Sequence, residues 1–231
     1  MVSGIVAEVS NNHNGSLDLA FRLLEEIKEA GADWVKFQCY TPDELVLLRG
    51  NGPAPEPWGS QGWKMHDLYK KAQTPHAWFP VLREKCKSLD LPWFSSVFGL
   101  KSLGVLEGLR CPAYKLASLD REQKGFRAEV RKTGKPIIQS TPKILHGINC
   151  HQLYCPPGYP QPKFHATELR TLMKIFDGIS YHGTNWETPA YALEHGASIV
   201  EVHVQLDDKP SELESEVSLT ISDLRKLVES K

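Results

Sequence analysis

The stretch Ile179–Gln205, ISYHGTNWETPAYALEHGASIVEVHVQ, decides the fold. It contains two short extended runs, Ile179–His182 and Ile199–Val204, on either side of one helical pattern. Thr188 and Pro189 predict the start of that helix as its N-cap and first-turn residue. A strand, a helix and a strand of this length form a βαβ unit, so we expect the two strands to be parallel and adjacent.

Alternation along the second run sorts its side chains onto two faces. The three valines of Ile199–Val204 form one apolar row, which suits a sheet face covered by helices. Glu201 and His203 are therefore expected to face inward, and the same parity turns Ser180 and His182 inward on the first run. Each histidine alone would more commonly be a hydrogen-bonded core or loop residue. Two imidazoles at neighbouring strand ends raise the metal or catalytic interpretation to equal weight and would form half of a metal site.

Composition narrows the classes of function. The chain has 231 residues and a formal net charge of −1, which suits one large domain with a single core. No basic stretch interleaved with aromatic residues appears, which argues against nucleic acid as a partner. The start, MVSGIVAEVS, lacks the features of a signal peptide, and no apolar run approaches the ~18 residues of a membrane span. Five cysteines without a C-x-x-C pair indicate reduced thiols, so we expect a cytoplasmic protein.

Strand and helix patterns alternate along the whole chain. The other strands are expected at Gly4–Val9, Trp34–Tyr40, Leu91–Val97, Ala113–Ala117, Pro136–Ser140 and Gln152–Cys155. The alternation predicts an α/β fold, a (β/α)8 TIM barrel forming one domain over residues 1–231, with an open doubly wound sheet as the alternative. Only TPKILHGINCH separates strands five and six, so the helix there should be missing or shortened. The Gly-, Pro- and Trp-rich segment Leu48–Lys64 would be a lid or a disordered insertion.

Polar side chains gather near the predicted carboxyl ends of the strands, where barrel enzymes build their sites. They are Glu8, Lys36, Gln38, Ser95, Ser96, Lys115 and, just after the fourth strand, Ser118 and Asp120. Lysines supply charge to a phosphate or carboxylate, hydroxyls donate hydrogen bonds, and a metal can polarise a carbonyl. We therefore expect an anionic substrate. In the alternative interpretation, Lys36 and Lys115 only pair with Glu8 and Asp120 as a structural network.

Eight segments in order resemble a known family. AEVSNNHNGS, GADWVKFQ, LPWFSSVFG, AYKLASLD, TGKPIIQST, YPQP, ISYHGT and GASIVEVHV are similar to the successive barrel motifs of the N-acetylneuraminate (sialic acid) synthase family. The resemblance implies a barrel that condenses phosphoenolpyruvate with an aldehyde sugar such as N-acetylmannosamine to a 2-keto-3-deoxy sugar acid. It also implies a divalent metal, usually manganese, with magnesium, cobalt or zinc as alternatives.

The same resemblance implies roles for individual residues. His182 and His203 would bind the metal, and Glu8 would be the acid/base near the sugar aldehyde and the attacking water. Asp120 takes the place of a family Glu as a second catalytic carboxylate. Glu214 falls where the family has an Asp that holds the sugar. The residues assigned to substrate binding are Lys36, Gln38, Ser96, Lys115, Ser118, Tyr159, Ser180 and Glu214.

The chain also departs from the family pattern. Pro157 stands where the family has an Asn that touches phosphate, and Tyr181 replaces the Asp of a Ser-Asp-His sequence. The chain is expected to lack the family's C-terminal antifreeze-like domain, which helps to recognise the sugar, so the acceptor stays open. Two alternatives follow: a barrel lyase or aldolase with a different donor, and a catalytically silent binding or scaffold homologue. The expected partners are small-molecule substrates, and a homo-oligomer is compatible with the sequence.

Overall fold

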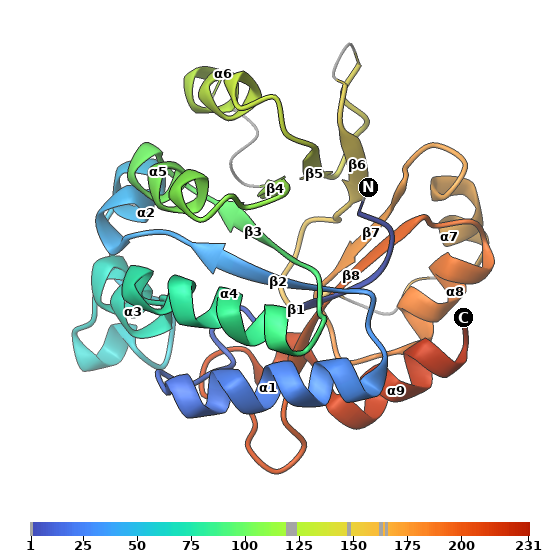
Figure 1. Cartoon of the computed structure of the whole chain (residues 1–231), viewed down its shortest axis with the longest axis horizontal. Helices are drawn as coiled ribbons and strands as arrows, with labels where there is room; N and C mark the ends of the chain where they lie inside the picture. Colours follow the sequence, from blue (N-terminus) through green and yellow to red (C-terminus); the bar gives the residue numbers. More distant parts are fainter. Residues whose placement is uncertain (1, 119–123, 147–148, 162–163, 165) are drawn as a thin grey trace.

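Eight parallel strands close into a barrel in the computed structural model, which describes residues 2–118, 124–146, 149–161, 164 and 166–231 (Figure 1). Consecutive strands pair in parallel, and β8 also pairs with β1, which closes the sheet. The strands are β1 (Gly4–Glu8), β2 (Trp34–Cys39), β3 (Trp93–Val97), β4 (Tyr114–Leu116), β5 (Ile137–Thr141), β6 (His151–Tyr154), β7 (Gly178–Tyr181) and β8 (Ile199–Gln205). A short β9 (Ser218–Thr220) pairs with the carboxyl end of β8. The predicted (β/α)8 barrel is therefore confirmed, and the open sheet is excluded.

Helices surround the barrel, and α1 lies between α4 and α9 (Figure 1). Those that follow the predicted alternation are α1 (Leu17–Ala30), α4 (Phe79–Ser88), α5 (Leu100–Gly108), α6 (Lys124–Lys132), α7 (Ala166–Leu172), α8 (Glu187–Glu194) and α9 (Ile221–Glu229). In α1, the Ser16 hydroxyl accepts the N–H of Leu19 at the start, and Gly31 adopts a φ of 85° at the end. Leu24 and Ile27 belong to its buried stripe. Within the described residues, no helix is both long and apolar enough to span a membrane.

The helix of the stretch Ile179–Gln205 begins slightly earlier than predicted. α8 starts at Glu187, and Thr188 lies inside its first turn. The Asn185 side-chain oxygen accepts the backbone N–H of Thr188 at 3.0 Å and its hydroxyl at 3.2 Å. The capping role predicted for Thr188 was therefore wrong: Trp186 is the N-cap and makes no side-chain cap, and the Asn185 carboxamide reaches the first turn from outside the helix.

The connection from β5 to β6 contains no helix among its described residues, 142–146 and 149–150, as the sequence predicted. A side chain holds it instead. The Gln152 amide accepts the N–H of Leu145 at 2.6 Å and donates to the Leu145 carbonyl at 2.9 Å. The oxygen and the nitrogen of one carboxamide thus pair with the backbone N–H and carbonyl of Leu145, which lies outside any helix.

Two helices after β2 lay outside the sequence prediction: α2 (Pro42–Arg49) and α3 (Met65–Ala72). The segment Leu48–Lys64 begins in the last turn of α2 and leads to the start of α3, with a 3-10 turn at Gly59–Gln61. Two backbone hydrogen bonds of 2.9 Å, from Ala54 to Trp63 and from Met65 to Gly52, close it into a compact loop. The lid and the disordered insertion both stay predictions for this segment.

Candidate active site

Strand register brings the predicted polar residues to one end of the barrel interior. Glu8 lies beside Lys36 on β2 and beside His203 on β8. Ser96 on β3 lies beside Lys115 on β4. Because side chains alternate along a strand, residues that pair in register point to the same face of a parallel sheet. The inward rows deduced from the sequence are therefore brought together by the closed sheet.

A buried network joins the two lysines to carboxylates. Lys115 donates to Glu201 Oε1 at 2.6 Å, and the Ser180 hydroxyl donates to the same oxygen at 2.8 Å. Lys36 Nζ lies 3.7 Å from Glu201 Oε2 and contacts the Glu8 carboxylate. These side chains are at most 3% exposed, so water screens their charges very little. Glu201 is thus the shared partner of both lysines.

The network shifts the pKa values of two of its members, Glu201 and Lys36. Burial would raise the pKa of Glu201, but Lys115 and Lys36 hold it far below its usual range. Burial lowers the pKa of Lys36 to about 7, despite the opposing effect of Glu201. Glu8 Oε1 is buried and accepts no hydrogen bond from any described residue. A buried acceptor without a partner costs free energy. This oxygen would therefore gain from a hydrogen bond donated by a ligand.

The two histidines meet at the carboxyl ends of β7 and β8. Their ring centroids lie 4.9 Å apart, with an angle of 67° between the ring planes. Glu214 Oε2 lies 3.0 Å from His203 Nδ1, and the Tyr159 hydroxyl donates to Glu214 Oε1 at 2.8 Å. The Tyr159 ring also packs 5.3 Å from the ring of His182. Four predicted site residues therefore form one cluster.

Gln161 fixes the environment of His182. Its side-chain oxygen accepts the backbone N–H of His182 at 3.0 Å, which directs its amide nitrogen to the Pro156 carbonyl at 3.1 Å and to His182 Nδ1 at 3.2 Å. Nδ1 of His182 is therefore an acceptor. Burial and the neighbouring His203 lower the pKa of His182 to about 3, so the ring is neutral.

Two imidazoles at this separation fit a shared divalent cation, because each ring can present one nitrogen lone pair to a metal. His203 would present Nε2 as a ligand if its Nδ1 carries the proton. In His182, Nδ1 accepts a hydrogen bond, so the proton lies on Nε2. That proton would have to move to Nδ1 before Nε2 could bind a cation. The described residues contain no group of three or more metal-binding side chains. Any cation here would need water or substrate to complete its coordination.

The remaining predicted residues are less tightly connected. Gln38 donates to the Ser10 hydroxyl at 2.9 Å, and Ser96 accepts from Lys36 at 2.8 Å. Ser118 is half-buried in the turn after β4. Asp120 lies outside the described residues, so its pairing with either lysine stays a prediction.

Sequence reasoning missed two features of the cluster. Glu201 was expected to face inward, but not to bridge the lysines, because a partner 86 residues away becomes visible only once the barrel closes. Gln161 belongs to the YPQP segment, which matched the family motif, but it follows irregular chain where alternation gives no direction.

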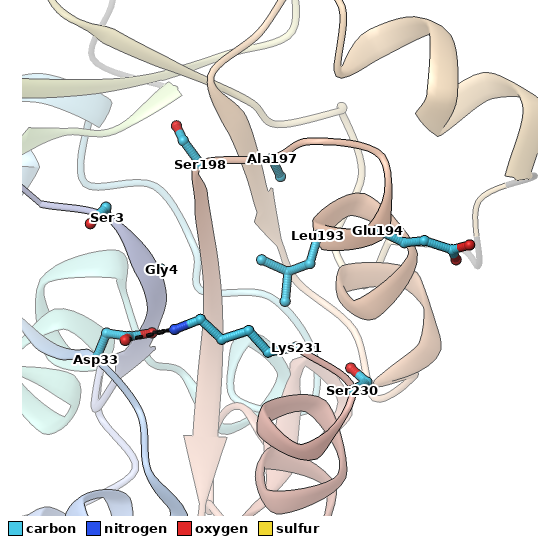
Figure 2. A pocket seen from close by; sticks show the side chains of 9 residues that line it. All are labelled: Ser3, Gly4, Asp33, Leu193, Glu194, Ala197, Ser198, Ser230 and Lys231. Carbon is cyan, nitrogen blue, oxygen red and sulfur yellow. Dashed lines mark hydrogen bonds and ion pairs between the residues drawn. The ribbon is translucent and has the colours of Figure 1, made fainter.

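A cavity of about 460 Å³ lies at the opposite, amino end of the barrel (Figure 2). It is lined by residues such as Gly4 at the start of β1 and Ser198 just before β8. Lys231 and Asp33 form an ion pair of 2.7 Å across it. None of the predicted site residues that the structure describes lines this cavity, so it is separate from the histidine and lysine clusters.

Comparison with known proteins identifies a matching family, related sequences and a solved structure of the same fold. The model of the NeuB family matches residues 23–231. Pseudaminic acid synthase of Helicobacter pylori is 34% identical, over 98% of this chain and 72% of the relative. Human N-acetylneuraminate-9-phosphate synthase is 28% identical, over 98% of this chain and 68% of the relative. The crystal structure of an N-acetylneuraminic acid synthetase from Leptospira borgpetersenii has the same fold, with a TM-score of 0.81 at 24% identity, over all of this chain and 82% of that one.

The family model and the Helicobacter relative both extend through the strands that carry the lysines and the histidine pair. On these grounds the chain belongs to the NeuB family.

Proposed function

We propose that the protein condenses phosphoenolpyruvate with an aldehyde sugar similar to N-acetylmannosamine and releases a 2-keto-3-deoxy sugar acid and phosphate. Membership of the NeuB family supports an enzyme of sugar-acid synthesis, since the relatives are named as synthases of such acids. The observation that carries the proposal is the buried lysine network beside the paired imidazoles of His182 and His203, at the end of the barrel where such enzymes react.

The lysines and nearby hydroxyls would bind the donor. An ammonium group has three N–H donors, so Lys115 can keep its bond to Glu201 and still bind an anion. Ser180 and Ser96, which already bond to members of the network, would add hydrogen bonds to the phosphate or carboxylate. The carboxylates that neutralise the lysines before the donor arrives would limit the charge left unpaired in the empty site.

Glu8 would move the proton. Its Oε1 is buried and unpaired, and its other oxygen is in contact with Lys36. In the proposed reaction the enol carbon of the donor attacks the aldehyde carbon, water adds to the resulting cation, and phosphate leaves. Glu8 would give a proton to the aldehyde oxygen or take one from the water, as a positioned general acid or base.

His182 and His203 would hold a divalent cation, for which we propose Mn²⁺, with Mg²⁺, Co²⁺ or Zn²⁺ as substitutes. When bound, such an ion would polarise the aldehyde oxygen as a Lewis acid. The support from this chain is the pair of adjacent imidazole rings and the Glu214 carboxylate against His203.

A barrel lyase or aldolase with a different donor remains the main alternative. Of the two departures that favour it, Tyr181 lies away from the inward row of the barrel. Tyr181 pairs in register with Val202, on the outer face of the sheet, and packs 6.3 Å from the ring of Phe164. Its replacement of the family Asp therefore does not alter the inward row that contains Ser180. Pro157 is exposed on the chain after β6.

Phosphate release tests the proposal. The protein would be incubated with phosphoenolpyruvate, Mn²⁺ and a panel of aldehyde sugars that includes N-acetylmannosamine. We expect phosphate release that requires one of the sugars, is abolished in Glu8→Gln, and is kept in Glu84→Gln, an exposed carboxylate on α4. Calorimetry would accompany the assay. Absence of both sugar-dependent release and binding of phosphoenolpyruvate would contradict the proposal and favour another donor or a silent homologue.

A further inference from the structure

Each oxygen of the Glu214 carboxylate has a partner inside the protein. Oε2 lies 3.0 Å from His203 Nδ1, and Oε1 accepts the Tyr159 hydroxyl at 2.8 Å. The Glu214 side chain is 15% exposed. One of the two partners, His203, is a proposed cation ligand.

The segment that carries Glu214 is held by hydrogen bonds to the loop after β1. The Asn14 side chain accepts the N–H of Glu212 at 2.9 Å and donates to the Pro210 carbonyl at 3.1 Å. The Ser211 hydroxyl accepts the N–H of Glu214 at 3.0 Å. These contacts tie residues 210–214 to the loop after β1. The loop after β1, which contains Asn11, Asn12 and Asn14, therefore fixes the segment that carries Glu214.

We infer that Glu214 is a positioning residue that holds His203 in the tautomer with its proton on Nδ1. A carboxylate accepts hydrogen bonds and has none to donate, so the Nδ1–H of His203 is the donor of this bond. A neutral imidazole with a proton on Nδ1 has its lone pair on Nε2. Glu214 would thereby present Nε2 of His203 as a ready ligand, in the way that carboxylates orient metal-binding histidines.

The inference rests on the proposed function only for the use of His203 as a ligand. Its direct content is the tautomer, which can be measured without metal or substrate. The contrast with His182 sharpens it, because Gln161 directs an N–H toward Nδ1 of that ring. The two imidazoles are therefore expected in opposite tautomers before a cation binds.

Nitrogen NMR of the metal-free protein, labelled with ¹⁵N in its histidine rings, tests this directly. Lone-pair and protonated ring nitrogens resonate in separate regions, and the His203 signals would be assigned by their loss in His203→Gln. We expect Nδ1–H and a lone-pair Nε2 for His203 in the wild type. Glu214→Ala should shift His203 toward a mixture of tautomers, and Glu214→Gln should largely preserve the wild-type form, since an amide oxygen still accepts from Nδ1. Glu212→Ala, an exposed acidic residue on the same segment, is the control and should change nothing.

Manganese affinity, measured by calorimetry, provides a second measurement. Glu214→Ala should weaken Mn²⁺ binding by about 10- to 100-fold, as loss of an orienting carboxylate does at other sites. A His203 ring that keeps its proton on Nδ1 in Glu214→Ala would overturn the inference, as would a tautomer change that leaves Mn²⁺ affinity unaltered. If the wild type bound no Mn²⁺, the metal part of the proposed function would fail, while the tautomer comparison would still decide the role of Glu214. Should Glu214→Ala fail to fold, Tyr159→Phe provides a milder test, because it removes only the hydrogen bond that Tyr159 donates to the carboxylate.

Discussion

Replacing Glu201 with Gln should destabilise the protein strongly, because Glu201 is the shared partner of two buried lysines. Lys115 Nζ lies 2.6 Å from one oxygen and Lys36 Nζ lies 3.7 Å from the other. The amide keeps the size of the side chain but removes the negative charge. Breaking a buried ion pair from one side costs about 3–5 kcal/mol, since the remaining charge has lost its compensation. We expect the free energy of unfolding of Glu201→Gln to fall by about that amount.

Urea denaturation at neutral pH, followed by circular dichroism, would measure the change. Glu216→Gln, an exposed carboxylate further along the chain, is the matched control and should stay within about 0.5 kcal/mol of the wild type. A double-mutant cycle with Lys115→Met identifies the partner. Because the second change removes the stranded charge, the double variant should lose less stability than the sum of the single variants, by about 1 kcal/mol or more. Additive losses, or a loss in Glu201→Gln no larger than in the control, would refute this account of the network.

Three other predictions concern donor binding, the segment Leu48–Lys64 and the dependence of stability on pH. Lys115→Ala should weaken binding of phosphoenolpyruvate by about 1.5–3 kcal/mol, as for a charge-assisted hydrogen bond, and equal affinity in calorimetry would speak against Lys115 as a donor ligand. If Leu48–Lys64 is a lid, ligand should change the fluorescence of Trp58 and Trp63 and slow proteolysis there, and cleavage at the same rate with and without ligand would rule this out. Burial lowers the pKa of His13 to about 4, below its value of 6.5 in the unfolded chain. The stability that His13 contributes is therefore complete above pH 6.5 and is lost as the pH falls toward 4, by about 2 kcal/mol between pH 8 and pH 5. His13→Asn should show a correspondingly shallower loss in acid denaturation, and parallel pH profiles would contradict the assignment.

Strand alternation explains why much of the site could be predicted from the sequence. A period of two fixes which residues of a strand share a face, so Lys36, Lys115, His203 and Glu201 could all be placed inward without a structure. The missing helix between β5 and β6 was equally predictable, because the chain between them is too short to form a helical layer. What alternation leaves undefined is which inward residues meet across the barrel.

Irregular segments and long-range partners escaped prediction for physical reasons. Gln161 and Glu214 lie outside the barrel strands, where no period defines a direction, so their bonds to His182 and His203 depend on the folded loops. The helix α2 was different, since Thr41 and Glu44 form a capping box that the sequence displays. That signal precedes a Gly- and Pro-rich segment, whose composition suggested a longer irregular region.

A crystal structure of the protein soaked with phosphoenolpyruvate and Mn²⁺ would test the central claim most directly. The account predicts an anomalous peak bonded to the imidazoles of both His182 and His203, with the phosphate and carboxylate of the donor on Lys36 and Lys115. An anomalous peak away from the two imidazoles, or phosphoenolpyruvate bound away from both lysines, would contradict it.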